Sequence, residues 1–123
     1  MTKVIVIPAD LNTPVRVDNL GGLEDYQRTV GGDIETIAYL EDVVPYFNEE
    51  GKLLGLEKNA RATAILAFNM FPDDYIAGDC IFAGFDGDTG EDLDIQDETA
   101  TYLQMTATKA MVDLTNGKEQ DGT

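Results

Sequence analysis

The chain contains no histidine and only one cysteine, Cys80. The absence of histidine excludes Ser-His and Cys-His nucleophilic systems, the commonest general base of enzymes and most zinc sites. A single cysteine cannot form an intrachain disulfide, which favours a cytosolic location. Because Cys80 lies in the apolar run 80–83, we expect its thiol to be buried and inert.

Basic residues are scarce: 8 Lys and Arg stand against 24 Asp and Glu, for a formal net charge of −16. No Lys or Arg lies between Arg61 and Lys109, a stretch that holds ten acids. Seven of these acids fall within thirteen residues: Asp86, Asp88, Glu91, Asp92, Asp94, Asp97 and Glu98. Such a surface repels nucleic acid and anionic lipid and attracts basic clefts. We therefore expect a protein partner and no direct binding to nucleic acid.

Long hydrophobic runs are also missing. No segment approaches the roughly 20 apolar residues of a membrane span. The N-terminal run is too short, and is broken too early by Pro8, to be a signal peptide. We therefore expect a cytoplasmic protein without membrane association. The 123 residues, 43% of them hydrophobic, suit one folded domain with a modest core.

Hydrophobic periodicity predicts an α+β fold with a mostly antiparallel sheet and two to three helices. Strands are indicated at Lys3–Ile7, Pro14–Asp18, Asp33–Leu40 and Val43–Phe47, and in a hairpin over Asp79–Ile95. Residues 52–56 stay open between a short strand and a packed loop.

The predicted helices cover about Leu23–Val30, a segment from a cap at Asn59 to about Asn69, and a last segment from Asp97 to Leu114. The second helix is apolar nearly all round, so we expect it to be deeply buried. We place one compact domain at residues 1–114 and a flexible polar tail at 115–123.

The sequence offers few groups for catalysis or cofactor binding. The turn Asp86–Asp92 carries alternating carboxylates of the kind that bind Ca²⁺, but the sixth position, where calcium loops need glycine, is Glu91. We interpret this segment as a solvated hairpin tip, because Asp-Gly pairs are common in turns. The adjacent pairs Glu49–Glu50 and Asp73–Asp74 lie in predicted loops and do not define a cleft. We expect no catalytic residue, no metal and no cofactor, and hence no enzyme.

Five segments form a pattern that is specific as a set: Val4–Asp10, Leu23–Glu35, Asn48–Leu56, Asn59–Ala64 and, more loosely, Ile76–Asp79. With them the chain resembles the DUF3846 domain, a family of small proteins of unknown function in phages, plasmids and integrative elements of bacteria. The resemblance implies an accessory protein of a phage or mobile element, and the family carries no established catalytic residues. The segments span about residues 3–85, so the acidic hairpin and the last helix lie outside them. This implies that the acidic face is a feature of this chain rather than of the family as a whole.

The first functional hypothesis gives the seven acids at 86–98 a role in partner binding. Their carboxylates can stand where a nuclease, restriction enzyme or polymerase expects DNA phosphates. The protein is then a non-enzymatic DNA mimic, an anti-defence inhibitor that occupies a basic cleft of a host protein.

The alternative hypothesis is a protein that binds or sequesters a nucleotide-like ligand. Arg16, Arg28 and Arg61 are its candidate anion contacts, because guanidinium groups suit phosphate geometry. Each is isolated in the sequence, however, and solvation of a helix surface is the simpler role. In a third interpretation the acidity serves only solubility or adaptation to salt. Self-association through a free sheet edge or the last helix stays open.

Overall fold

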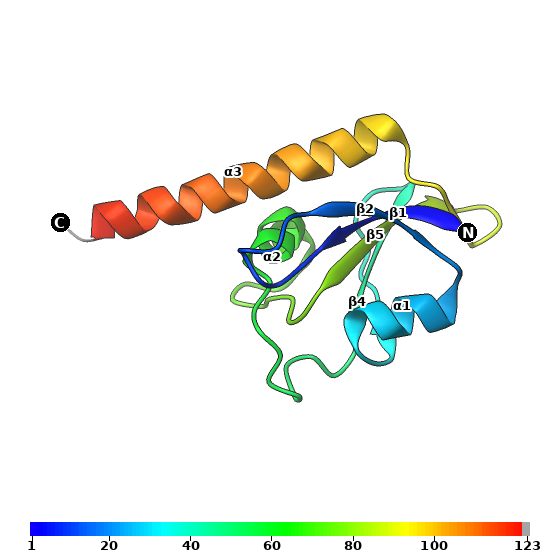
Figure 1. Ribbon diagram of the computed structural model, residues 1–123, viewed down its shortest axis with the longest axis horizontal. Coiled ribbons are helices and arrows are strands. Elements are labelled where there is room, and N and C mark those ends of the chain that lie inside the picture. The colour runs from blue at the N-terminus through cyan, green and yellow to red at the C-terminus, as the bar shows by residue number, and fades with distance from the viewer. Residues whose placement is uncertain (122–123) are drawn as a thin grey trace.

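An antiparallel sheet lies at the centre of the computed structural model, which describes residues 1–121, with side chains up to Leu114 (Figure 1). The described residues form six strands: β1 (Thr2–Ile7), β2 (Arg16–Leu20), β3 (Ile34–Glu35), β4 (Val43–Asn48), β5 (Cys80–Asp86) and β6 (Glu91–Leu93). They also form three α-helices: α1 (Leu23–Val30), α2 (Ala60–Leu66), which continues into a 3-10 turn at Ala67–Asn69, and α3 (Asp97–Asp121). The predicted α+β fold, one compact domain with a mostly antiparallel sheet, is confirmed.

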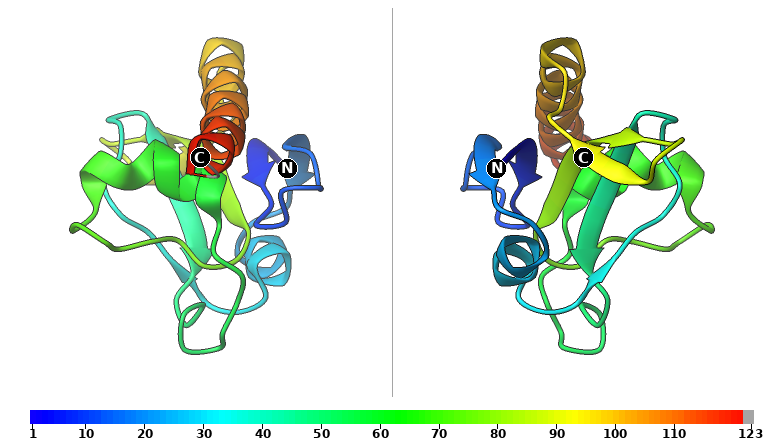
Figure 2. Two further views of the ribbon diagram at one scale, coloured as in Figure 1. Left: turned by 90° about the vertical axis from the view of Figure 1, so that its left-hand side faces the viewer. Right: turned by 90° about the vertical axis from the view of Figure 1, so that its right-hand side faces the viewer.

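Helices cover both faces of the sheet (Figure 2). The strand order is β2-β1-β5-β4-β3, and β6 pairs with the end of β5. In β1, Val4 and Val6 pack with helix α1, whereas Ile5 and Ile7 pack with α2 and α3. Because both faces are buried, β1 is a continuous apolar run rather than an alternating one.

Helix α3 packs against the rest of the domain through its first half. Ala100, Leu103, Ala107 and Ala110 are buried, and the later part of the helix projects beyond the body (Figure 1). Residues 115–121, which the sequence places in a flexible tail, continue this helix. The rest of the predicted tail, residues 122–123, lies outside the described residues. Within residues 1–121, no helix combines the length and apolar character that crossing a membrane requires.

The strand predicted at Asp33–Leu40 is only two residues long, because its neighbour contains a proline. β3 pairs with the last residues of β4. Further along the same edge of β4 lies Pro45, which has no N–H to donate to a ladder bond. Its carbonyl accepts a hydrogen bond from the Thr36 hydroxyl instead. Residues 52–56, left open between strand and loop, are no strand: residues 52–55 form turns and Leu56 has no regular structure.

Helix α2 begins at a buried cap and is buried on one side only. Asn59 caps it as predicted, since its side-chain oxygen accepts from the Ala62 amide at 2.9 Å. The side-chain nitrogen of Asn59 donates to the carbonyls of Ile7 and Gly78. These bonds join the start of α2 to β1 and to the segment before β5. The deep burial predicted all round is wrong, because Phe68 in the following turn is fully exposed.

Candidate functional site

The seven acids singled out in the sequence lie together at one end of the sheet, and we call them the acidic tip: Asp86, Asp88, Glu91, Asp92, Asp94, Asp97 and Glu98. Asp86 and Glu91 face each other across the β5–β6 hairpin, so the predicted hairpin is confirmed. Lys3 connects this hairpin with α3. Its backbone N–H donates to Asp94 at 2.8 Å, and its ammonium group pairs with Asp97 at 2.5 Å. Through these contacts with Lys3, the acids of the hairpin and those at the start of α3 are held close together.

Several acids of the acidic tip already have partners within the fold. The Asp86 carboxylate accepts hydrogen bonds from two backbone amides of its own turn. Tyr46 donates its hydroxyl to Asp92 at 2.7 Å, and burial together with this carboxylate raises the pKa of Tyr46. A hydrogen bond from Lys3 holds the pKa of Asp97 below its usual range. The Tyr46 bond ties the hairpin to β4, and the Lys3 ion pair ties the start of α3 to β1.

The remaining acids of the tip point to solvent. Asp88, Glu91 and Glu98 are exposed, and their side chains form no hydrogen bond or ion pair with any described residue. Asp42 lies beside the same hairpin, because its backbone carbonyl accepts from the Phe85 amide at 2.9 Å. Within the described part of the chain, no group of three or more His, Cys, Asp or Glu residues could hold a metal ion.

The three arginines of the ligand-binding alternative are each engaged elsewhere. Arg16 pairs with Asp18 on β2 at 3.3 Å, and Arg28 pairs with Asp25 on α1 at 2.8 Å. Arg61 is buried, so the predicted role on a solvated helix surface is wrong for this residue. One terminal nitrogen of its guanidinium group donates to three backbone carbonyls of the loop after β1, at 2.7–3.1 Å. The structure gives these arginines separate partners rather than one anion site.

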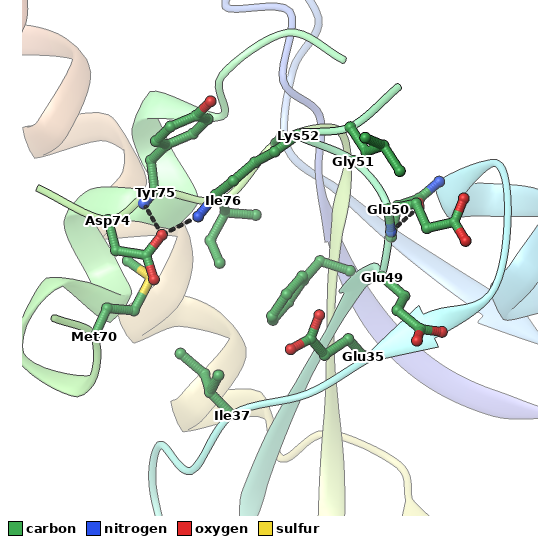
Figure 3. A pocket seen from close by; sticks show the side chains of 14 residues that line it. Glu35, Ile37, Glu49, Glu50, Gly51, Lys52, Met70, Asp74, Tyr75 and Ile76 are labelled. Carbon is green, nitrogen blue, oxygen red and sulfur yellow. Dashed lines mark hydrogen bonds and ion pairs between the residues drawn. The ribbon is translucent and has the colours of Figure 1, made fainter. Parts of the chain in front are cut away.

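A cavity of about 310 Å³ opens at the other end of the sheet (Figure 3). Its lining comes from the end of β4 and the turn after it, from part of the β3 segment, and from the segment leading into β5. The lining residues are Glu35, Ile37, Phe47, Asn48, Glu49, Glu50, Gly51, Lys52, Leu53, Met70, Asp74, Tyr75, Ile76 and Ala77. Sequence reasoning missed this cavity. It treated Glu49–Glu50 and Asp73–Asp74 as loop pairs that define no cleft, whereas Glu49, Glu50 and Asp74 line one cavity. No local pattern signals that these loops face each other.

Close backbone packing shapes the cavity. A Cβ at Gly51 would lie 2.7 Å from the carbonyl oxygen of Ala77, so only glycine lets the two loops approach so closely. On the sheet side, the buried Asn48 side chain donates to the Val30 carbonyl and accepts from the Glu50 amide. The turn after β4 is thus held from both sides.

The two sides of the cavity differ in charge. Lys52 forms an ion pair with Asp74 and lies 4.8 Å from the centre of the Tyr75 ring. The hydrogen bond from Lys52 holds the pKa of Asp74 below its usual range. Figure 3 shows three carboxylates on the side away from this pair, those of Glu35, Glu49 and Glu50. The cavity therefore carries a fixed ion pair on one side and negative charge on the other.

Fold and surface together define a small α+β domain with a helix-covered antiparallel sheet, an acidic tip at one end and a polar cavity at the other. The chain belongs to DUF3846, a family described as a domain of unknown function, whose sequence model matches residues 1–108. No curated protein and no solved structure matches the chain. The matched range extends beyond the segments that carry the resemblance and includes the acidic tip.

Proposed function

We propose that the protein binds, through its acidic tip, a basic nucleic-acid-binding surface of another protein, and that it catalyses no reaction. The observation that carries this proposal is the position of Asp88, Glu91 and Glu98. These side chains are exposed on a hairpin and a helix start that other bonds hold in place. Charges on a rigid support lose little conformational freedom when they meet a partner.

Electrostatics favours a basic partner over any other. A formal net charge of −16 raises the local concentration of cationic surfaces and speeds their association at low salt. The structure pairs only one side-chain cation, Lys3, with the described residues of the tip, so most of the charge there stays available. A bacterial nuclease, restriction enzyme or polymerase presents a complementary cleft, and blocking one is the anti-defence role that we propose for a cytoplasmic protein of a phage or mobile element.

Two other interpretations predict different behaviour. A nucleotide-binding protein needs an anion site, but Arg16 and Arg28 pair with neighbouring acids and Arg61 holds backbone carbonyls. Acidity that serves only solubility or salt adaptation needs no partner. In that case, replacing acids at the tip should have the same effect as replacing the same number of acids elsewhere on the surface. Exchanging charges at the tip therefore separates these interpretations from ours.

The test is capture of partners from bacterial lysate on the immobilised protein at low salt, with elution by duplex DNA. The tip variant combines Asp88→Lys, Glu91→Lys and Glu98→Lys, none of which breaks a bond within the described residues. The matched control combines Glu49→Lys, Glu50→Lys and Glu57→Lys. It makes the same change in net charge at exposed positions near the other end of the sheet.

We expect a nucleic-acid-binding enzyme to be retained by the wild type and the control, to be released by duplex DNA, and to be lost with the tip variant. The captured enzyme should also lose DNA binding when the wild-type protein is added. If duplex DNA releases nothing, or if both variants retain the same proteins as the wild type, the acidic tip is not a binding face.

A further inference from the structure

Another cavity, of about 410 Å³, lies between helix α3 and the loop after β1, with one residue of α2 at its wall. Its volume is within the range of small-molecule sites, roughly 300–1,000 Å³. No acid lines this cavity, although the chain has 24 Asp and Glu. The apolar part of its wall consists of Leu11, Pro14, Val15, Ala107 and Met111.

The α2 residue at this cavity is Arg61, and among the described residues that line it, Arg61 alone carries a charge. Arg61 is only 3% exposed, and it forms no ion pair with any described residue. One terminal nitrogen of its guanidinium group holds the three backbone carbonyls described above. The Nε atom is buried and has no hydrogen-bond partner in the described part of the chain. Buried donors without a partner are rare in folded proteins, so this group calls for an acceptor.

Two acids lie near Arg61 but bind other groups. Burial lowers the pKa of Arg61, and the charges of Asp10 and Asp79 partly oppose this effect. The Asp10 carboxylate accepts hydrogen bonds from two groups of its own turn, and the Asp79 carboxylate accepts from the Ala9 amide at 2.9 Å. These acids therefore balance part of the charge without contact and leave Nε of Arg61 without an acceptor.

A carboxylate is the ligand group that suits this arginine. It accepts hydrogen bonds from a guanidinium group and has the opposite charge, so it supplies the contacting counter-ion that a buried cation needs. The apolar wall suits a hydrocarbon chain on the same molecule, because burying methylene groups there removes apolar surface from water. A nucleotide's phosphates call for several cations, and Arg16 and Arg28 pair elsewhere.

We propose that this cavity binds a small aliphatic carboxylate. The carboxylate accepts from an N–H group of Arg61 that has no partner within the fold, and the hydrocarbon chain lies against the apolar wall formed by the loop after β1 and α3. The cavity shares no residue with the acidic tip, so the proposal does not rest on the function proposed above and can fail or succeed without it.

Methyl resonances of methionine can test this proposal, because the chain has only 4 methionines. Met111 lines this cavity, whereas Met70 lines the cavity at the end of β4 and serves as the internal control. The protein is titrated with hexanoate at about 150 mM salt, which screens the repulsion between the acidic surface and an anion. Hexanamide and hexylamine carry a neutral and a cationic head group on a chain of the same kind, and they are the control ligands.

Two pairs of variants locate the site. Arg61→Lys keeps the positive charge but removes the guanidinium donors, and Arg28→Lys makes the same change at an exposed arginine of α1. Thr108→Trp places an indole at the cavity, and Thr101→Trp places one at an exposed position of α3 that does not line it. Because Thr108 is exposed, Thr108→Trp leaves the carbonyl bonds of Arg61 in place and decides the question even if Arg61→Lys does not fold.

We expect hexanoate to shift the Met111 methyl with saturation and to leave Met70 unchanged. Hexanamide and hexylamine should bind at least about tenfold more weakly, equivalent to about 1.4 kcal/mol, because neither carries a negative charge to pair with Arg61. An unmoved Met111 resonance, or equal binding of hexanoate and hexanamide, would overturn the proposal.

Arg61→Lys and Thr108→Trp should each weaken hexanoate binding at least about tenfold. Arg28→Lys and Thr101→Trp should stay within about twofold of the wild type, since neither residue lines the cavity. Wild-type affinity in Thr108→Trp or in folded Arg61→Lys, or equal losses in a variant and its control, would also contradict the proposed site.

Discussion

Replacing Asn59 by alanine tests whether one buried side chain holds three parts of this fold together. Asn59 is fully buried and forms hydrogen bonds of 2.8, 3.0 and 2.9 Å with Ile7, Gly78 and Ala62. Asn59→Ala removes all three bonds, and the backbone groups of Ile7, Gly78 and Ala62 that they satisfy lie in buried residues.

The size of the effect follows from these bonds. A buried polar group that loses its partner costs about 1–3 kcal/mol, so three groups together with the lost helix cap should cost about 3–5 kcal/mol. A domain of this kind has a free energy of unfolding of about 5–15 kcal/mol. The melting temperature should therefore fall by about 10–20 °C, at about 3–5 °C per kcal/mol.

Urea and thermal unfolding measure this loss, with Asn69→Ala as the control at an exposed position near the end of the same helical segment. Asn59→Asp is the second arm. It keeps the cap to Ala62 but directs a carboxyl group at two carbonyls, and burial raises the pKa of such a group. A raised pKa in the folded state makes stability fall as the pH rises, so this variant should lose more, relative to the wild type, at pH 7 than near pH 4. A loss below about 1 kcal/mol for Asn59→Ala, the size of one ordinary hydrogen bond, would refute the reasoning.

Three further predictions concern other buried positions. A Cβ at Gly84 would lie 2.6 Å from a backbone oxygen beyond β6, so Gly84→Ala should lower the free energy of unfolding by about 1–3 kcal/mol, measured with urea. A Cβ at Gly87 meets nothing within 4 Å, so Gly87→Ala should cost less than about 1 kcal/mol. Equal losses in the two variants would contradict this. Arg61→Met should lower the free energy of unfolding by about 2–4 kcal/mol by freeing buried carbonyls, and the exposed Arg28→Met by less than about 1 kcal/mol. Burial raises the pKa of the Cys80 thiol, so a disulfide reagent at about pH 8 should label the native protein at least about a hundredfold more slowly than the denatured one; fast native labelling would exclude this burial.

Elements whose pattern is local were predicted from the sequence. The run in β1, the hairpin with its Asp-Gly turn and the Asn59 cap depend on residues a few positions apart, and all three occur in the structure. The long strand predicted after α1 fails because Pro45, in another strand, removes the donor that would extend the ladder. That information lies outside the segment itself.

Candidate sites were less predictable than strands, because a site depends on which side chains meet. The sequence marks the acids of the tip but does not distinguish Asp92, bound by Tyr46, from Glu91, which is exposed. It treats Arg61 as a surface residue, whereas this side chain is needed to pair carbonyls of a loop some 50 positions away.

The sequence by itself determined the negative charge, the lack of histidine chemistry and the apolar strands, because these follow from composition and short-range periodicity. Only the tertiary structure decided which acids are bound within the fold and where a cavity opens. Lys3 meets Asp94 across 91 positions of sequence, and the walls of the cavity come from segments that approach closely where Gly51 lies against Ala77. Such contacts arise when the sheet assembles and buries its two faces, and no local pattern encodes them.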